Sequence, residues 1–249
     1  MAVIFATQDF NMKKIVLALL VLTSSTAFAQ KKKDWSKVDL NQAGDHFMIQ
    51  LSSDHWSGVP DSISNHIKGF SRGLNIYVMT NKPFKTDPRW SVAFGIGIGS
   101  SSMSFKKMAV DLKSPGAVLP FRNLDSLDHF KKYKLVTAFL EAPVELRYTF
   151  NPEKQNKSWK IALGAKVGTM LNAHTKGKTL LNKDGATINS YSAKENKKVF
   201  FNTTRVSGTV RVGIGNFSLF SSYQLTSLLK DGAGAEMHPY QIGLCISGL

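Results

Sequence analysis

The chain has 249 residues, with 32 lysine and arginine residues against 17 aspartate and glutamate residues, a formal net charge of +15, and a single cysteine, Cys245. One cysteine excludes an internal disulfide and any zinc site built from cysteines. In a cytosolic protein this charge would favour nucleic acid as the partner, but the N-terminus predicts export, and we therefore expect no nucleic-acid partner.

The segment at 12–29 has the three parts of a secretory signal peptide. Residues 12–14 (MKK) are positively charged, residues 15–22 (IVLALLVL) are apolar, and residues 27–29 (AFA) form a small-x-small cleavage site. The sequence therefore predicts a protein exported through a signal peptide that is cleaved after Ala29.

The remaining chain divides into three further parts. Residues 1–11 fit no part of a signal peptide, and we interpret them as a mis-assigned upstream start. Residues 30–44 are assigned to an N-terminal periplasmic segment and residues 45–249 to one folded domain. The part after Ala29 contains no apolar stretch long enough for a transmembrane helix, so it either stays in the periplasm or crosses a membrane as strands.

The folded domain shows an alternation with a period of two residues, which indicates β-strands. It is clearest at 90–101, where Trp90, Val92, Phe94, Ile96 and Ile98 alternate with glycine, alanine and serine. Eight segments carry the pattern, and the strong ones are long enough to cross a bilayer at a tilt. In chain order they are 47–53, 73–80, 90–101, 136–150, 159–171, 203–215, 217–225 and 240–247.

The connections between these segments alternate in length. Short joins at 81–88, 151–157 and 215–216 fall at one end, and longer joins fall at the other, at 55–69, 102–134, 173–199 and 226–238. Outer-membrane barrels have short periplasmic turns and longer outer loops. The fold class predicted is therefore all-β, an eight-stranded antiparallel up-and-down transmembrane β-barrel. The alternation alone also fits a soluble periplasmic lipocalin-like barrel whose apolar face points inward to a ligand.

Charged side chains in three of the strands share the parity opposite the apolar face. If the apolar face contacts lipid, these side chains point into the lumen, where acids and bases pair across neighbouring strands. We expect a lumen charge network made of Glu141, Glu145, Arg147, Lys160, Lys166, Arg205 and Arg211.

Outward-facing aromatic residues are expected to form two girdles at the membrane interfaces. The girdle near the short joins comprises Trp90, Tyr148, Phe150, Trp159 and Phe217. The girdle near the long joins comprises Phe200, Tyr223 and Tyr240.

The excess of positive charge is concentrated in the expected loops and turns. Basic loops suit contact with outer-membrane lipid and with lipopolysaccharide phosphates, although solvated loops explain any single cluster equally well. The clusters lie at 31–33, 106–107, 131–134, 154–157, 176–178 and 194–198.

Several phrases give the chain a family likeness. They are AFAQ at the end of the signal peptide, GIGIGSS, LEAPVELRY, LGAKVGTMLN and the terminal PYQIGLCISGL. Through them the chain resembles the PorT-like outer-membrane β-barrel family of Bacteroidota, over nearly all of the part after Ala29. The resemblance implies an integral outer-membrane protein, and some members of that family are similar to accessory factors for protein secretion. Pro143 in LEAPVELRY lacks a backbone donor and predicts a bulge or an unpaired position.

No catalytic, cofactor or metal site stands out. No two of the six histidines have metal-ligand spacing beside a carboxylate, and we expect no metal and no cofactor. His174 with Ser207 or Ser222 could be imagined as a lipid-modifying pair at the barrel rim, but no spacing supports it.

The expected function is therefore that of a non-enzymatic outer-membrane barrel with a lumen filled by side chains. It would act as an anchor, scaffold or recognition element through basic outer loops, towards lipid, lipopolysaccharide or an unknown envelope protein. Two alternatives stay open: a rim enzyme that modifies lipid or lipopolysaccharide, and the soluble ligand-binding barrel.

Overall fold

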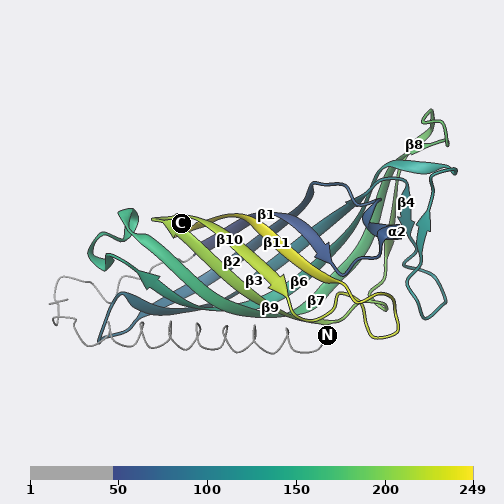
Figure 1. Cartoon of the computed structure of the whole chain (residues 1–249). Coiled ribbons are helices and arrows are strands. Elements are labelled where there is room, and N and C mark those ends of the chain that lie inside the picture. The colour runs from purple at the N-terminus through teal and green to yellow at the C-terminus, as the bar shows by residue number, and fades with distance from the viewer. Residues whose placement is uncertain (1–46, 249) are drawn as a thin grey trace, which may run out of the picture. The chain divides into compact units, whose positions relative to one another are not determined.

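A computed structural model describes residues 47–248 of the chain (Figure 1). The expected signal peptide, the residues before it, the segment 30–44 and the basic cluster at 31–33 lie outside the described residues. Eight strands build the barrel. They are β1 (Phe47–Ser57), β2 (Ser71–Pro83), β3 (Trp90–Phe105), β6 (His129–Thr149), β7 (Trp159–Leu181), β9 (Thr204–Ile214), β10 (Phe217–Gln224) and β11 (His238–Ser247).

Each of these strands pairs antiparallel with the next barrel strand along the chain, and β1 closes the circle on β11. The closing register sets Met48 opposite Ser247 and Ser57 opposite His238. Every predicted strand segment lies within or largely overlaps one of the eight strands, so the eight-stranded antiparallel up-and-down barrel is confirmed. Among residues 47–248 no helix is long and apolar enough to span a membrane.

The three short connections lie together at one end of the barrel. In the connection 84–89, the guanidinium of Arg89 donates to both carboxylate oxygens of Asp87, which lowers the pKa of that carboxyl. The connection 150–158 holds a short 3-10 helix, η2 (Pro152–Lys157). The two-residue turn between β9 and β10 needs Gly215, whose φ is 59° and whose Cβ, if present, would lie 2.3 Å from the carbonyl oxygen of Asn156.

The four longer connections lie at the opposite end, and three of them contain a helix or strands of their own. The connection 58–70 holds α2 (Asp61–Ser64), and the connection 106–128 holds the hairpin of β4 (Met108–Val110) and β5 (Phe121–Asn123). Strand β8 (Thr187–Asn196) lies between β7 and β9 in the chain and pairs with β7. The predicted segregation of short and long connections is therefore present.

The interpretation of 173–199 as a loop is wrong. Strand β7 continues to Leu181, β8 returns along it, and β6 begins at His129. These strands of 21 and 23 residues exceed the roughly 9–11 residues that cross a bilayer. They extend beyond the barrel towards β8 and β4 (Figure 1). The extension has no apolar alternation, because strands that leave the lipid contact water and need no apolar outer face.

A one-residue bulge in β7 divides its membrane part from its extension. Ala138 of β6 pairs with Asn172, whereas Phe139 pairs with Met170, so that Leu171 is the extra residue. A shift of one residue exchanges the two faces of a strand. Below the bulge the odd-numbered side chains of β7 face outward, and above it the even-numbered ones do.

Pro143 occupies an unpaired position, one of the two arrangements that its missing donor allows. The β3–β6 ladder runs from Trp90 to Phe94 and resumes at Gly97 opposite Glu141, so the register is kept but the position opposite Pro143 is skipped. On the other side, Pro143 lies opposite Lys166 of β7.

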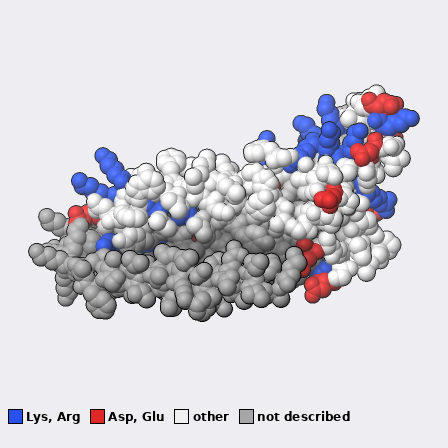
Figure 2. All heavy atoms as spheres, viewed as in Figure 1, with Lys and Arg blue, Asp and Glu red and all other residues white. Residues whose placement is uncertain are grey.

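The outer face of the barrel is apolar. Aliphatic residues that include Leu51, Ile98, Val144, Leu163 and Leu244 are exposed around the barrel, which is the arrangement of a lipid-facing wall. In Figure 2, most Lys and Arg side chains on the visible face gather towards the two ends, with other residues between them. The apolar-inward alternative therefore does not describe this barrel.

Val167 of β7 offers a direct test of the lipid-facing wall. It is 52% exposed, and Val118 in the connection 106–128 is 56% exposed, so the two valines differ mainly in whether they face lipid. We expect Val167→Arg to lower the free energy of unfolding from lipid vesicles by about 2–3 kcal/mol, because a cation on the lipid face is costly. Val118→Arg should leave it within about 0.5 kcal/mol. Urea titration of both variants measures this, and equal losses would contradict a lipid-facing Val167.

Candidate functional site

Glu141 of β6 is the centre of one buried ion cluster in the lumen. Its Oε2 lies 3.4 Å from Lys166 Nζ, and its Oε1 lies 3.2 Å from Arg205 Nη1. Tyr77 donates its hydroxyl to the same carboxylate, and Lys166 donates to the Tyr77 oxygen at 3.4 Å. The strand opposite leaves space for this carboxylate at Gly99, where a Cβ would lie 2.6 Å from Glu141 Oε2.

Glu145, four residues further along the same face of β6, is the centre of a second cluster. Arg147 Nε and Arg211 Nη2 each donate to its Oε2 at 2.8 Å. Arg211 also donates to the hydroxyls of Ser218 and Ser247, both at 3.2 Å. The guanidinium of Arg211 therefore joins β9 to β6, β10 and β11 across the lumen.

A third group of polar side chains fills the lumen on the side of β1, β2 and β11. Asn75 donates to the side-chain oxygens of Gln50 and Gln241 at 3.1 and 3.2 Å. Gln241 in turn donates to both carboxylate oxygens of Asp54. Sequence reasoning missed Asp54, although its parity on β1, opposite to that of Leu51, points it inward.

Six of the seven residues expected in the lumen network are buried and lie in these clusters. Lys160 differs: it has inward parity on β7 but is partly exposed near the short-connection end. These buried side chains occupy the centre of the barrel, as expected for a barrel of eight strands.

An apolar cluster fills the barrel mouth at the end of the long connections. Phe105, Leu135 and Phe139 point inward from the barrel strands, and they pack against the loops above them. The other members include Ile63, Met103, Met108, Val110, Leu112, Leu119, Tyr133, Met170, Phe200, Phe201, Leu228, Leu229 and Met237.

Hydrogen bonds fasten the loops over this mouth cluster. The hydroxyl of Tyr133 donates to the carbonyl of Val110 and accepts from its amide, at 2.9 and 3.0 Å. The amide of Leu119 donates to the carbonyl of Ala233 at 2.8 Å, which ties the connection 106–128 to the connection 225–237. The sequence signal for this cluster was the inward parity of Met103 and Phe105, which their serine and lysine neighbours concealed, together with that of Phe139 on β6.

The aromatic residues near the short connections lie at the surface. Trp90 packs edge-on against Tyr148 with ring centroids 4.9 Å apart, and Tyr148 packs against Phe150 at 5.1 Å. Trp159 and Phe217 are exposed nearby on β7 and β10.

The second girdle needs a correction. Tyr223 is exposed and Tyr240 is half-buried, stacked on His55 with centroids 5.2 Å apart. Phe200 is only 3% exposed and belongs to the mouth cluster, so placing it on the outer face is wrong. It precedes β9, where the chain folds inward over the mouth, and strand parity does not apply there.

The structure does not bring the imagined rim pair together. Ser207 and Ser222 are buried in the lumen, whereas His174 lies above the bulge of β7 and contacts Asn172 at 3.3 Å. Within residues 47–248, no group of three His, Cys, Asp or Glu side chains is placed to hold a metal ion.

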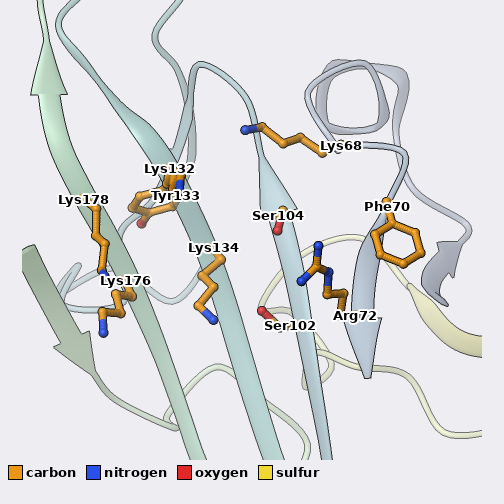
Figure 3. Close-up of a pocket in the computed structure, with 10 residues that line it drawn as sticks. All are labelled: Lys68, Phe70, Arg72, Ser102, Ser104, Lys132, Tyr133, Lys134, Lys176 and Lys178. Carbon is orange, nitrogen blue, oxygen red and sulfur yellow. The ribbon is translucent and has the colours of Figure 1, made fainter. Parts of the chain in front are cut away.

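A cationic groove of about 480 Å³ lies on the part of the strands that extends beyond the barrel, at the end of the long connections (Figure 3). We call it the lysine groove. Lysine and arginine side chains from β2, β6, β7 and the connection before β2 point into it, and no carboxylate lines it. Its lining comprises Lys68, Phe70, Arg72, Ser102, Ser104, Lys132, Tyr133, Lys134, Lys176 and Lys178.

Comparison with known proteins gives one family match. The sequence model of the outer membrane protein beta-barrel domain matches residues 28–228. No match was found among curated proteins. Among solved structures, the chain is similar to Ail, the attachment invasion locus protein of Yersinia pestis, with 13% identity and a TM-score of 0.35 over 83% of this chain and 97% of that chain. It is also similar to Neisserial surface protein A, with 9% identity and a TM-score of 0.34 over 83% of this chain and 99% of that chain.

Glu145 provides the test of the lumen clusters. Glu145→Gln removes the carboxylate to which two buried guanidiniums donate, and we expect it to lower the free energy of unfolding by about 3 kcal/mol. Adding Arg211→Gln should recover part of that loss, because it removes one of the buried cations. Urea titration in vesicles measures both, with the exposed Glu236→Gln as the control. A single variant as stable as the control would show that the pair contributes nothing.

Proposed function

We propose that this chain, which belongs to the outer membrane protein beta-barrel domain family, is a non-enzymatic recognition element that acts through its cationic outer end. The protein is an outer-membrane β-barrel, and the barrel anchors that end in the membrane. The longer connections of such barrels face the outside of the cell, so the lysine groove and the extension of β6, β7 and β8 face outward.

The observation that carries the proposal is that the barrel is filled in two layers. Ion clusters around Glu141 and Glu145 occupy the middle of the lumen, and the apolar mouth cluster occupies its outer end. A filled barrel offers no route for a solute, which leaves the outer surface as the part that meets other molecules. That surface is folded and rich in lysine, which suits recognition of an anionic surface.

The two alternatives have less support. A soluble ligand-binding barrel needs an inward apolar face and an open cavity, whereas here the apolar wall faces outward. A rim enzyme of the imagined kind needs His174 beside a serine, whereas Ser207 and Ser222 point into the lumen. The likeness to PorT-like barrels of Bacteroidota, which rests on phrases such as LEAPVELRY, is part of this proposal, and we carry no secretion role over from it.

The filled lumen predicts an electrically silent protein. The purified protein inserted into a planar bilayer should give no stepwise conductance in about 1 M salt, a concentration at which even narrow pores conduct measurably. An open-pore porin in the same bilayer is the positive control. Reproducible conductance steps from this protein would contradict a lumen closed by side chains.

Recognition at the outer end is testable on intact cells. A photoreactive amino acid placed at Val118 or at Ile188 reports the long-connection end, and one placed at Phe84 reports the short-connection end as a control. All three side chains are exposed and apolar, so they differ mainly in the end of the barrel that they occupy.

We expect discrete adducts with a surface glycolipid or an envelope protein from Val118 and Ile188, and fewer of them when the cells are illuminated in high salt, because salt screens an electrostatic contact. Adducts from Phe84 alone, or none from either outer position, would contradict recognition at this end.

A further inference from the structure

The lysine groove brings like charges directly opposite one another across paired strands. Lys134 of β6 is the register partner of Lys176 of β7, and Lys132 is the partner of Lys178. Lys176 is also the partner of Lys194 on β8. Directly opposite residues have Cβ atoms about 4.5–5.5 Å apart, and like charges at such positions destabilise a sheet.

Nothing within the described residues neutralises these pairs. No ion pair to Lys132, Lys134, Lys176 or Lys178 occurs within residues 47–248, and no carboxylate lines the groove. Glu195 is close in sequence to Lys194 but has the opposite parity, because its register partner is the buried Thr175. The arrangement therefore favours binding of an anion from outside the described residues.

The bulge in β7 creates this arrangement. Above Leu171 the even-numbered residues of β7 face outward, which sets Lys176 and Lys178 on the same face as Lys132 and Lys134. In Figure 3 these side chains extend from neighbouring strands into the same space as Arg72.

The groove also adjoins the lipid-facing wall. Arg72 precedes Leu74 by one pleat on the outer face of β2, and Leu74 belongs to the exposed aliphatic band. Phe70, 62% exposed, stands beside Arg72, whose guanidinium carbon lies 5.2 Å from the ring centroid. Cations above an apolar wall match an amphiphile whose anionic head group lies above its acyl chains.

We propose that the lysine groove binds the phosphate groups of a phosphorylated glycolipid of the outer leaflet, of the lipid A type, whose acyl chains lie against the aliphatic band. This deepens the proposed function and rests on it for the outward orientation of the long connections. The lysines supply point charges, Arg72 supplies a forked donor suited to phosphate, and the hydroxyls of Ser102 and Ser104 supply neutral donors. A soluble polyanion would use the same cations but would gain nothing from the apolar wall.

The experiment uses the full-length mature protein in phosphatidylcholine nanodiscs. The probes are lipid A with both phosphates, the same lipid A after enzymatic dephosphorylation, and a soluble sulfated polysaccharide. Binding is measured by native mass spectrometry and by the shift in the thermal midpoint. The groove variants are Lys134→Gln with Lys176→Gln, and Lys132→Gln with Lys178→Gln. The matched control is Lys154→Gln with Lys157→Gln, at the short-connection end.

We expect the wild type and the control to bind phosphorylated lipid A, and each groove variant to bind it about tenfold more weakly. Dephosphorylated lipid A should bind to the wild type, the control and the groove variants as weakly as phosphorylated lipid A binds to the groove variants. Without lipid A, each groove variant should have a thermal midpoint at or above that of the wild type, because a like-charge pair has been removed. A purely structural role for the lysines would lower that midpoint instead.

Three results would overturn the proposal. The first is equal binding of phosphorylated and dephosphorylated lipid A, and the second is groove variants that bind phosphorylated lipid A as tightly as the wild type does. The third is a sulfated polysaccharide that binds to the wild type and is not displaced by lipid A. These failures differ from failure of the proposed function. Loss of adducts at Val118 and Ile188 on cells contradicts outer-end recognition, whereas retained adducts with phosphate-independent binding contradict only the glycolipid.

Discussion

The antiparallel pairing of β1 with β11 leaves the barrel with no open strand edge. In hydrocarbon, an unpaired backbone amide or carbonyl costs several kcal/mol, so a sheet can cross a membrane only when it is closed. Closure with a fixed register then decides where every side chain points, because alternate residues of each strand must face either lipid or lumen. The apolar wall and the buried ions are two results of the same constraint.

The lumen shows how this constraint is met with charged residues. Glu141 and Glu145 lie on the inward face of β6, and each meets cations from β7 or β9. Space for them comes from the glycines of β3 and β7: a Cβ at Gly97 would lie 2.6 Å from the ring of Tyr77, and one at Gly168 would lie 2.8 Å from Glu141 Cγ. The phrase GIGIG is therefore needed for packing as well as for alternation.

The parts of the fold that could be predicted from sequence are those in contact with lipid. Where a strand has lipid on one side and polar side chains on the other, its sequence alternates visibly, as in 90–101. The extension of β7 to Leu181 and the hairpin with β8 lie beyond the lipid, and their sequences carry no such alternation. The mouth cluster was missed for a related reason, since residues such as Phe200 and Leu229 are buried by loops that no periodic pattern places. The lysine clusters at 131–134 and 176–178 were visible as charge, but their meeting depends on a register that includes one extra residue.

Because Leu171 is an extra residue in β7, an insertion or deletion at this point would change which face of the strand its side chains occupy. Removing one residue there would leave the composition almost unchanged, yet it would exchange the interior and exterior of β7 above the bulge. Thr175 and Gly177 would come to the outside and Lys176 and Lys178 would turn in. During evolution, the gain or loss of a single codon at this point could therefore create or remove the cationic face in one step. Point substitutions would have to change several lysine positions to do the same. Among related barrels, the length of this strand between Trp159 and His174 would then report the character of the outer surface better than its residue identities do.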